Sequence, residues 1–256
     1  MSTLQTHQLD INIAGKNVCR QLNLCIEPGQ TWGILGRNGI GKTTLLHTLA
    51  GLRQPTGGQI NLDGNDIQQL PRKQFAKHLG LLLQQSEETF PATVLEMVLT
   101  GRHPHIGTWS WESEHDLEIA QHSLDLVDMN NMSSRPIDQL SGGERQRAAI
   151  AQLLTQSPDI YLLDEPNSHL DLHYQSRLLQ HFSTLTKQHD ASVVMSLHDI
   201  NLAQYFCSHV ALIFGDGEVR SGTAKELLTA NTLSDLYQHT MLEANTKHGV
   251  QFIPEK

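Results

Sequence analysis

The sequence is poor in the features that mark secreted, membrane-spanning or nucleic-acid-binding proteins. It has only three cysteines, Cys19, Cys25 and Cys207, and no CxxC pattern. An odd cysteine count without metal-ligand spacing indicates reduced thiols in a cytosolic protein rather than a disulfide framework. Cys19 and Cys25 are separated by an even number of residues in a β-like stretch, so we expect both to pack on one face.

Long apolar runs and excess basic charge are also missing. No run approaches the ~18 apolar residues needed to cross a bilayer, and the polar start MSTLQTHQLD lacks a signal-peptide pattern. Lys and Arg number 18 against 27 Asp and Glu, a net charge of −9. Because nucleic-acid binding needs clustered basic side chains, no nucleic-acid partner is expected. A hydrophobic content of 38% over 256 residues still allows a sizeable core.

Strand-like and helix-like segments alternate along most of the chain. Residues 4–35 favour β structure, with a turn at Ala14-Gly15, and residues 93–156 favour helices. Strands and helices then alternate again, and helices are expected after Gly222. This pattern predicts an α/β fold with a mainly parallel sheet flanked by helices, an N-terminal β region and an inserted helical block.

The segment GRNGIGKT, residues 36–43, matches the P-loop pattern and lies between a predicted strand and a predicted helix. In such a loop, backbone N–H groups wrap the β-phosphate, Lys42 reaches the β- and γ-phosphate oxygens, and the Thr43 hydroxyl can ligate Mg²⁺. The nucleotide-binding residues predicted here are Gly36, Asn38, Gly39, Gly41, Lys42, Thr43 and Thr44.

Two further motifs follow the P-loop. In LSGGERQR (140–147), Ser141 offers a hydroxyl, Gly142 and Gly143 offer unobstructed N–H groups, and a predicted helix directs its positive end at an anion. The segment DIYLLDEP (159–166) is typical of a buried strand that ends in two carboxylates. Asp164 is placed to hold Mg²⁺, and Glu165 to orient and polarise an attacking water.

The order of these motifs resembles that of the ATP-binding cassette (ABC) ATPases, and the resemblance covers essentially the whole chain. It implies that Gln84 is the Q-loop glutamine, with Gln85 as the weaker candidate, that Asp171 belongs to the D-loop, and that His198 is the switch histidine. The cofactors implied are ATP and Mg²⁺. The implied catalytic residues are Glu165, His198 and Gln84, and the implied metal-site residues are Thr43, Gln84 and Asp164.

The same resemblance implies a composite site in a homodimer. Ser141, Gly142, Gly143 and Asp171 of one chain would face the P-loop of a second copy. The implied organisation is a single ABC ATPase domain over 1–256. Within it, 1–86 and 157–256 form a RecA-like core with an N-terminal antiparallel β subdomain, and 87–156 form a helical subdomain.

The segment TVLEMVLTGRHPHIG (93–107) resembles the ATPases of importers for iron–siderophore complexes, haem, vitamin B12 and molybdate. This implies a cytoplasmic protein on the inner face of the cell membrane, contacting two permease subunits near Arg102–Trp111. A periplasmic or surface substrate-binding protein would act indirectly. Trp109 and Trp111 suit an interface, although packing within the helical subdomain explains them equally well.

Other functions were weighed against the importer. An iron–sulfur cluster assembly ATPase is the main alternative. A DNA-repair ATPase does not fit, because the short span from Gln84 to Ser141 has no room for its coiled coil. An exporter ATPase is a further possibility, although exporters often carry membrane spans in the same chain. The intact Glu165 and His198 argue against a module that binds nucleotide without hydrolysing it.

The residue at the adenine-stacking position and the histidine pairs bear on base selectivity and on metal binding. Many ABC ATPases stack adenine on an aromatic residue where this chain has Ile13, so we expect weakly base-selective nucleotide binding. The fifteen histidines include the pairs His103/His105 and His169/His173. Neither pair has a third ligand nearby in sequence, so no histidine metal site is expected.

Overall fold

The computed structural model describes residues 1–84, 91–107, 109–168, 170–247 and 249–255. The strands form two larger β-sheets and a small two-stranded hairpin. The main sheet has the order β11-β10-β4-β9-β8-β7, and the second sheet has the order β2-β1-β5-β6 with β3 paired to β1. The main-sheet strands are β4 (Thr31–Gly36), β7 (Leu79–Leu82), β8 (Ile160–Leu163), β9 (Ser192–Ser196), β10 (His209–Gly215) and β11 (Glu218–Thr223). The second sheet contains β1 (Leu4–Ile13), β2 (Lys16–Leu22), β3 (Cys25–Ile26), β5 (Gly57–Leu62) and β6 (Asn65–Asp66).

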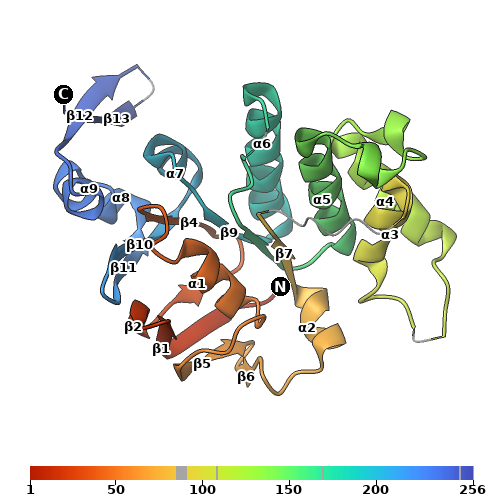
Figure 1. Ribbon diagram of the computed structural model, residues 1–256, viewed down its shortest axis with the longest axis horizontal. Helices are drawn as coiled ribbons and strands as arrows, with labels where there is room; N and C mark the ends of the chain where they lie inside the picture. Colours follow the sequence, from red (N-terminus) through yellow and green to blue (C-terminus); the bar gives the residue numbers. More distant parts are fainter. Residues whose placement is uncertain (85–90, 108, 169, 248, 256) are drawn as a thin grey trace.

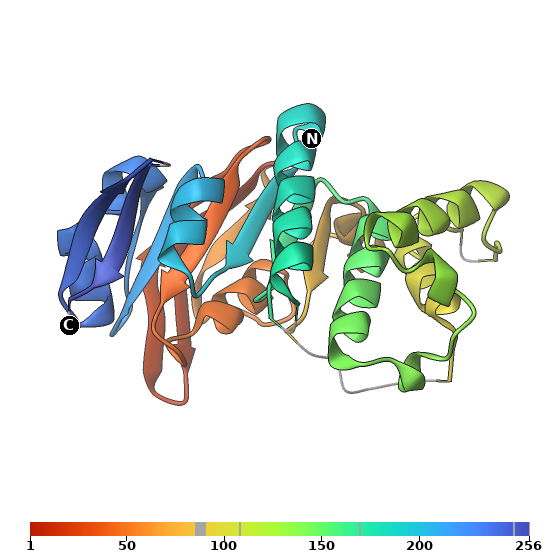
Figure 2. The ribbon, with the colours of Figure 1, turned by 90° about the horizontal axis from the view of Figure 1, so that it is seen from above.

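Helices cover both faces of the main sheet and form one end of the molecule (Figure 1). They are α1 (Lys42–Leu49), α2 (Arg72–His78), α3 (Val94–Leu99), α4 (Glu114–Leu126), α5 (Gly142–Gln156), α6 (Leu172–His189), α7 (Ile200–Phe206), α8 (Ala224–Leu227) and α9 (Ala230–Tyr237). Short 3₁₀ turns lie at Thr100–Arg102, Asn130–Met132 and Ile137–Gln139. Helices α3, α4 and α5, here called the helical segment, lie at the end of the molecule opposite the C-terminus in both views (Figure 2).

The main sheet is parallel from β10 to β7, and only the edge strand β11 runs antiparallel. The second sheet is antiparallel throughout. Strands β4, β8 and β9 are buried along their full length, as expected for parallel strands covered on both faces. The predicted α/β fold with an antiparallel β region and a helical insert is confirmed.

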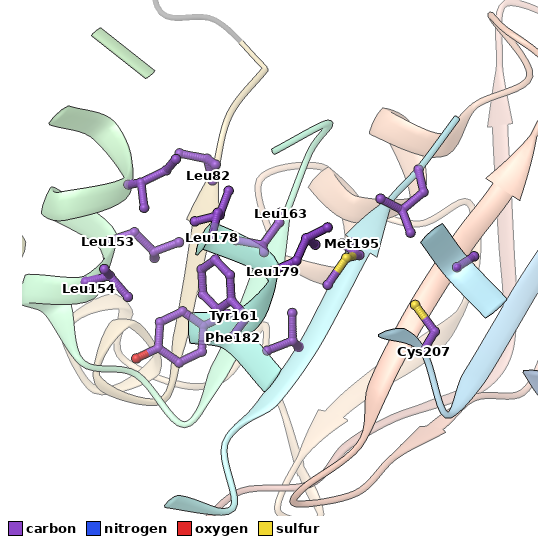
Figure 3. Packing of buried hydrophobic residues seen from close by; sticks show 14 of the residues in the cluster. Leu82, Leu153, Leu154, Tyr161, Leu163, Leu178, Leu179, Phe182, Met195 and Cys207 are labelled. Carbon is purple, nitrogen blue, oxygen red and sulfur yellow. The ribbon is translucent and has the colours of Figure 1, made fainter. Parts of the chain in front are cut away.

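Alternate residues of the central strands enter two different cores. Leu162 and Val194 face α1 and the antiparallel sheet, whereas Leu163 and Met195 face α5 and α6. Figure 3 shows the second core, in which Leu178, Leu179 and Phe182 of α6 pack against Tyr161, Leu163 and Met195, with Leu153 and Leu154 of α5 beside them. The sheet is therefore fixed from both sides, and the loops at its strand ends have a firm base.

Two expectations about local structure were wrong. Cys19 is buried on β2 while Cys25 is exposed on β3, because the strand stops at Leu22 and restarts at Cys25 instead of running on. The chain also does not end in helices alone. A hairpin of β12 (Met241–Thr246) and β13 (Gly249–Pro254) follows α9, and its alternation was weak because few of its residues are buried.

Candidate functional site

The P-loop begins where β4 ends, at Gly36, and finishes at Gly41, the N-cap of α1. Gly36, Gly39 and Gly41 have φ values of 154°, 71° and 118°, which a residue with a Cβ rarely adopts. A Cβ on Gly36 would lie 2.8 Å from the Ile213 carbonyl oxygen, and one on Gly41 would lie 2.6 Å from Val18 Cγ1. The loop is thus packed on β10 and β2, with its exposed tip at Asn38 and Gly39.

Lys42 lies folded over this loop. Its ammonium donates hydrogen bonds to the carbonyl oxygens of Gly36, at 2.9 Å, and Arg37, at 3.3 Å. Burial lowers the pKa of Lys42 below its ordinary value, while the nearby carboxylates of Glu165 and Asp164 oppose that shift. The next two residues, Thr43 and Thr44, lie half-buried in the first turn of α1. The structure therefore gathers a cation and two hydroxyl side chains at one helix start.

Asp164 and Glu165 follow β8, and both bond to the Ser196 hydroxyl group, Asp164 through its carboxylate and Glu165 through its backbone N–H. Asp164 is fully buried, and its Oδ1 accepts a hydrogen bond from Ser196 Oγ at 2.7 Å. Ser196 Oγ also accepts from the Glu165 backbone N–H at 2.7 Å. That contact holds Glu165 at a φ of 48°, a left-handed conformation uncommon for glutamate and typical of constrained sites.

Ser196 was missed at the sequence level. Its only signal was its place two residues before His198, at the end of a predicted strand.

The Glu165 carboxylate joins three strand ends. Its Oε2 accepts from Gln84 Nε2 at 2.7 Å, and its Oε1 lies 2.7 Å from His198 Nε2. Gln84 follows β7, Glu165 follows β8 and His198 follows β9, which are neighbours in the parallel sheet. The carboxyl edge of such a sheet is where ligands bind, and β4 delivers the P-loop to the same edge. The weaker candidate Gln85 lies outside the described residues.

A divalent cation fits the arrangement. Within the described ranges, Asp164 Oδ2 is a buried oxygen without a hydrogen-bond partner. A buried carboxylate oxygen left unpaired is costly unless a ligand satisfies it. Because the Gln84 amide nitrogen is committed to Glu165, its amide oxygen is the atom that can serve as a ligand. Carboxylate, amide and hydroxyl oxygens are the donors that Mg²⁺ prefers.

The start of the LSGGERQR segment is held by bonds within its own helix, and Glu144 also forms an ion pair with Arg135. Ser141 is the N-cap of α5, where its hydroxyl accepts from the Glu144 N–H and the Glu144 carboxylate accepts from the Ser141 N–H at 2.7 Å. Ser141 and Gly142 are exposed, and a Cβ on Gly142 would meet nothing within 4 Å. Figures 1 and 2 show α5, which Ser141 caps, on the far side of β7 and α6 from α1, the helix that follows the P-loop.

Asp171, the predicted D-loop residue, caps its own helix. Its Oδ1 accepts from the Tyr174 N–H at 3.0 Å, at the start of α6. The next residue, Leu172, is 81% exposed. This helix start therefore presents a capping carboxylate and an exposed apolar side chain next to each other.

The expected permease-facing run from Arg102 to Trp111 divides into a buried and an exposed part. Arg102 was expected near a partner, but it is buried and pairs through Nε with Asp116 Oδ1 at 2.8 Å. Gly101 packs so closely that a Cβ would lie 2.3 Å from the Gln152 carbonyl oxygen of α5. Trp109 and Trp111 are 97% and 90% exposed. Arg102 thus fastens the helical segment together, whereas Trp109 and Trp111 face outward.

Metal-binding groups and membrane-spanning helices can be assessed for the described residues as a whole. No group of three or more His, Cys, Asp and Glu side chains is arranged to hold a metal ion, and His169 of one predicted pair lies outside those residues. None of the described helices is both long and apolar enough to span a membrane.

Comparisons with known proteins place this site in a family. A family model described as "ABC transporter" matches residues 19–168. The probable siderophore transport system ATP-binding protein of Bacillus subtilis is 36% identical over 93% of this chain and 86% of its own length. A putative metal-chelate type ABC transporter in an inward-facing conformation has a TM-score of 0.85 and 28% identity, covering 100% of this chain and 98% of that one.

A bacterial ABC transporter cassette solved as a dimer has a TM-score of 0.76 and 27% identity, covering 86% of this chain and 98% of that one. Cassettes of this kind bind ATP, dimerise and pair with permease subunits. The chain therefore belongs to the ABC transporter family, as an ATP-binding subunit.

Proposed function

We propose that this protein is the ATP-hydrolysing subunit of a bacterial ABC importer that takes up a metal chelate: an iron–siderophore complex, haem, cobalamin or the related cargo molybdate. The observation that carries the catalytic part is the Glu165 carboxylate, held between Gln84 and His198 at the sheet edge that bears the P-loop. The importer part is supported by the siderophore transport relative, which matches over 93% of this chain.

The proposed reaction is transfer of the γ-phosphoryl group of ATP to water. The P-loop N–H groups and Lys42 bind the phosphates. The Lys42 ammonium has three donors, two of which lie on the carbonyl oxygens of Gly36 and Arg37. Glu165 orients and polarises the attacking water, and His198 contacts the γ-phosphate. Catalysis of this kind depends mainly on positioning and charge stabilisation.

Mg²⁺ would be held by Thr43, Gln84 and Asp164, and when bound it offsets the charge of the β- and γ-phosphate oxygens. The unpaired Asp164 oxygen supports this assignment. In the proposed dimer, Ser141, Gly142, Gly143 and Asp171 of one chain complete the site of the other. Asn38, Gly39 and Thr44 belong to the phosphate cradle.

The permease contact is proposed at Trp109 and Trp111. Both indoles are almost fully exposed, and they project from a run that Arg102 anchors to the helical segment. Rigid aromatic side chains on a firm base are common at the centres of protein interfaces. The protein would work in the cytoplasm on the inner face of the cell membrane. A periplasmic or surface substrate-binding protein would act through the permease, without touching this chain.

Affinity purification from detergent-solubilised membranes tests this proposal. We expect the tagged chain to capture a membrane permease, together with its substrate-binding protein. Trp109→Ala/Trp111→Ala should lose the permease and keep ATP binding. Tyr205→Ala serves as the matched control, because Tyr205 is 75% exposed on α7, away from the proposed contact.

Capture of soluble partners alone would overturn the importer assignment and favour the iron–sulfur assembly alternative. An unchanged permease yield with the double tryptophan variant would instead contradict only the contact surface.

A further inference from the structure

The P-loop is tied to the C-terminal part of the chain by one long side chain. Arg37, the residue after the first P-loop glycine, donates from Nη1 to Gln238 Oε1 at 2.5 Å, across 201 positions of sequence. Its guanidinium passes over the end of β10, since a Cβ on Gly215 would lie 4.0 Å from Arg37 Nη2. The contact joins the phosphate-binding loop directly to the end of α9.

The anchor at Gln238 is firmly held. Gln238 ends α9 in a left-handed conformation, with φ of 55°. Leu233 and Leu236 of α9 are 0% and 1% exposed and belong to the same core as the main sheet. Two residues that follow the helix bond back to Ser234 within it. The His239 N–H donates to the Ser234 carbonyl oxygen, and the Met241 N–H donates to the Ser234 hydroxyl. The backbone that carries Gln238 is thus fixed to the main core, and the exposed Gln238 side chain extends from it to Arg37.

The same C-terminal unit, defined here as α9, β12 and β13, also reaches the switch region. Asn201, three residues after His198, donates to the Phe252 carbonyl oxygen at 3.2 Å and accepts the Phe252 N–H at 2.8 Å. A two-way bond between one amide side chain and one residue fixes both partners. The unit is therefore attached beside the P-loop and beside His198.

Arg37 is bonded through its carbonyl oxygen to Lys42 and through its side chain to Gln238, and nucleotide binding affects these two bonds differently. Lys42 donates to the Arg37 carbonyl oxygen from inside the site at 3.3 Å, and bound phosphate competes for the same ammonium. Gln238 holds the Arg37 side chain from outside and has no such competitor. We propose that Arg37 and Gln238 are positioning residues that keep the P-loop in its phosphate-binding shape while phosphate competes for the Lys42 ammonium. This rests on the proposed nucleotide site and makes the C-terminal unit a determinant of ATP affinity.

Equilibrium ATP titration and steady-state ATPase kinetics on the purified full-length chain test this inference. We expect Gln238→Ala to raise the Kd and KM for ATP about 3- to 10-fold and to leave kcat within about 2-fold. Arg37→Ala should do at least as much. Gln238→Glu should keep wild-type affinity through a charge-assisted bond to Arg37. The control is Gln251→Ala, on the exposed outer side of β13, which should change nothing.

The double variant Arg37→Ala/Gln238→Ala separates the tether from other effects. If the two residues act through each other, its Kd should match that of Arg37→Ala instead of multiplying the two losses. A loss with Arg37→Ala but none with Gln238→Ala would make Arg37 a direct phosphate contact and overturn the proposal. A lower melting temperature of the Gln238→Ala variant with an unchanged Kd for ATP would also overturn the proposal. Failure of the wild-type chain to bind ATP would instead refute the proposed nucleotide site.

Discussion

The two regions that the proposed dimer brings together around ATP are held in different ways. Around Glu165, groups from three neighbouring strand ends hold one another, through Gln84, Ser196 and His198. At Ser141, the contacts come from Glu144, three positions away in the same helix, and the front of the helix is open. The first region is held by contacts between separate strand ends of one chain, whereas the second presents an exposed helix start. In the proposed dimer, a second copy closes this divided site.

The comparison predicts its largest effect at Glu165. Glu165→Gln should reduce ATP turnover by about 10²- to 10⁴-fold, because an amide cannot polarise the attacking water as a carboxylate does. ATP binding should persist, and the variant should accumulate as an ATP-dependent dimer. Phosphate release and light scattering with and without ATP measure both outcomes.

Glu118→Gln is the matched control, since Glu118 is an exposed carboxylate of the helical segment. Near-normal turnover by Glu165→Gln would remove Glu165 from the chemistry.

Ser141→Arg tests the open region. A bulky cation at the start of α5 should block closure, so we expect ATP binding to survive while dimerisation and turnover fall about 100-fold or more. Mixing Ser141→Arg with Glu165→Gln gives a sharper test. The mixed dimer contains one intact core facing one intact Ser141, and its turnover should exceed that of either variant alone. A mixture no more active than its components would argue against a site shared between chains.

How far the sequence predicts the two regions depends on how local their determinants are. The P-loop, LSGGERQR and the Asp164-Glu165 pair are short segments whose chemistry follows from residue types in order, so their elements were predictable. Ser196 was not, because its role depends on a sheet order that brings β9 beside β8. Arg102 was misplaced for a related reason: its partner Asp116 belongs to α4, and a guanidinium in a polar run gives no sign that it is buried.

The C-terminal hairpin shows the same limit. Its register pairs exposed Leu242 with exposed Ile253, and only Met241 and Phe252 are buried. So few buried positions leave almost no hydrophobic alternation for a sequence pattern to detect. What the sequence cannot supply are contacts between elements far apart in the chain, including the link from Arg37 to Gln238.

The buried part of the Arg102–Trp111 run should matter for stability. Arg102→Ala removes the bonds to Asp116 and to the Thr155 carbonyl oxygen, so we expect a loss of about 3 kcal/mol in the free energy of unfolding. Denaturant unfolding followed by circular dichroism measures this. Glu118→Ala, which breaks an exposed contact to His115, should cost less than about 0.5 kcal/mol. Equal losses in the two variants would show that Arg102 does not fasten the helical segment.

Asp116 should also make stability depend on pH. The hydroxyl and backbone N–H of Ser113, together with Arg102, hold the pKa of Asp116 far below its ordinary value. Its stabilising contribution is therefore present above the unfolded pKa of about 4 and is lost as the pH falls from there toward the folded value. In Asp116→Asn the slope of stability against pH below about pH 4 should be shallower by up to ~1.4 kcal/mol per pH unit. An unchanged slope would contradict the assignment.

The smallest expected effect concerns the base of the nucleotide, which neither region touches. Ile13 lies half-buried at the end of β1, paired with Lys16 across the turn of the β1–β2 hairpin. An aliphatic side chain gives adenine no stacking platform, so wild-type Kd values for ATP and GTP should agree within about 5-fold. Ile13→Tyr should tighten ATP binding by about 1 kcal/mol, the lower end of base–aromatic stacking, and Ile13→Leu should not. Strong ATP preference in the wild type would mean that other residues read the base. Those residues would form a third region of the proposed site, beside the triphosphate contacts of one chain and Ser141 of the other.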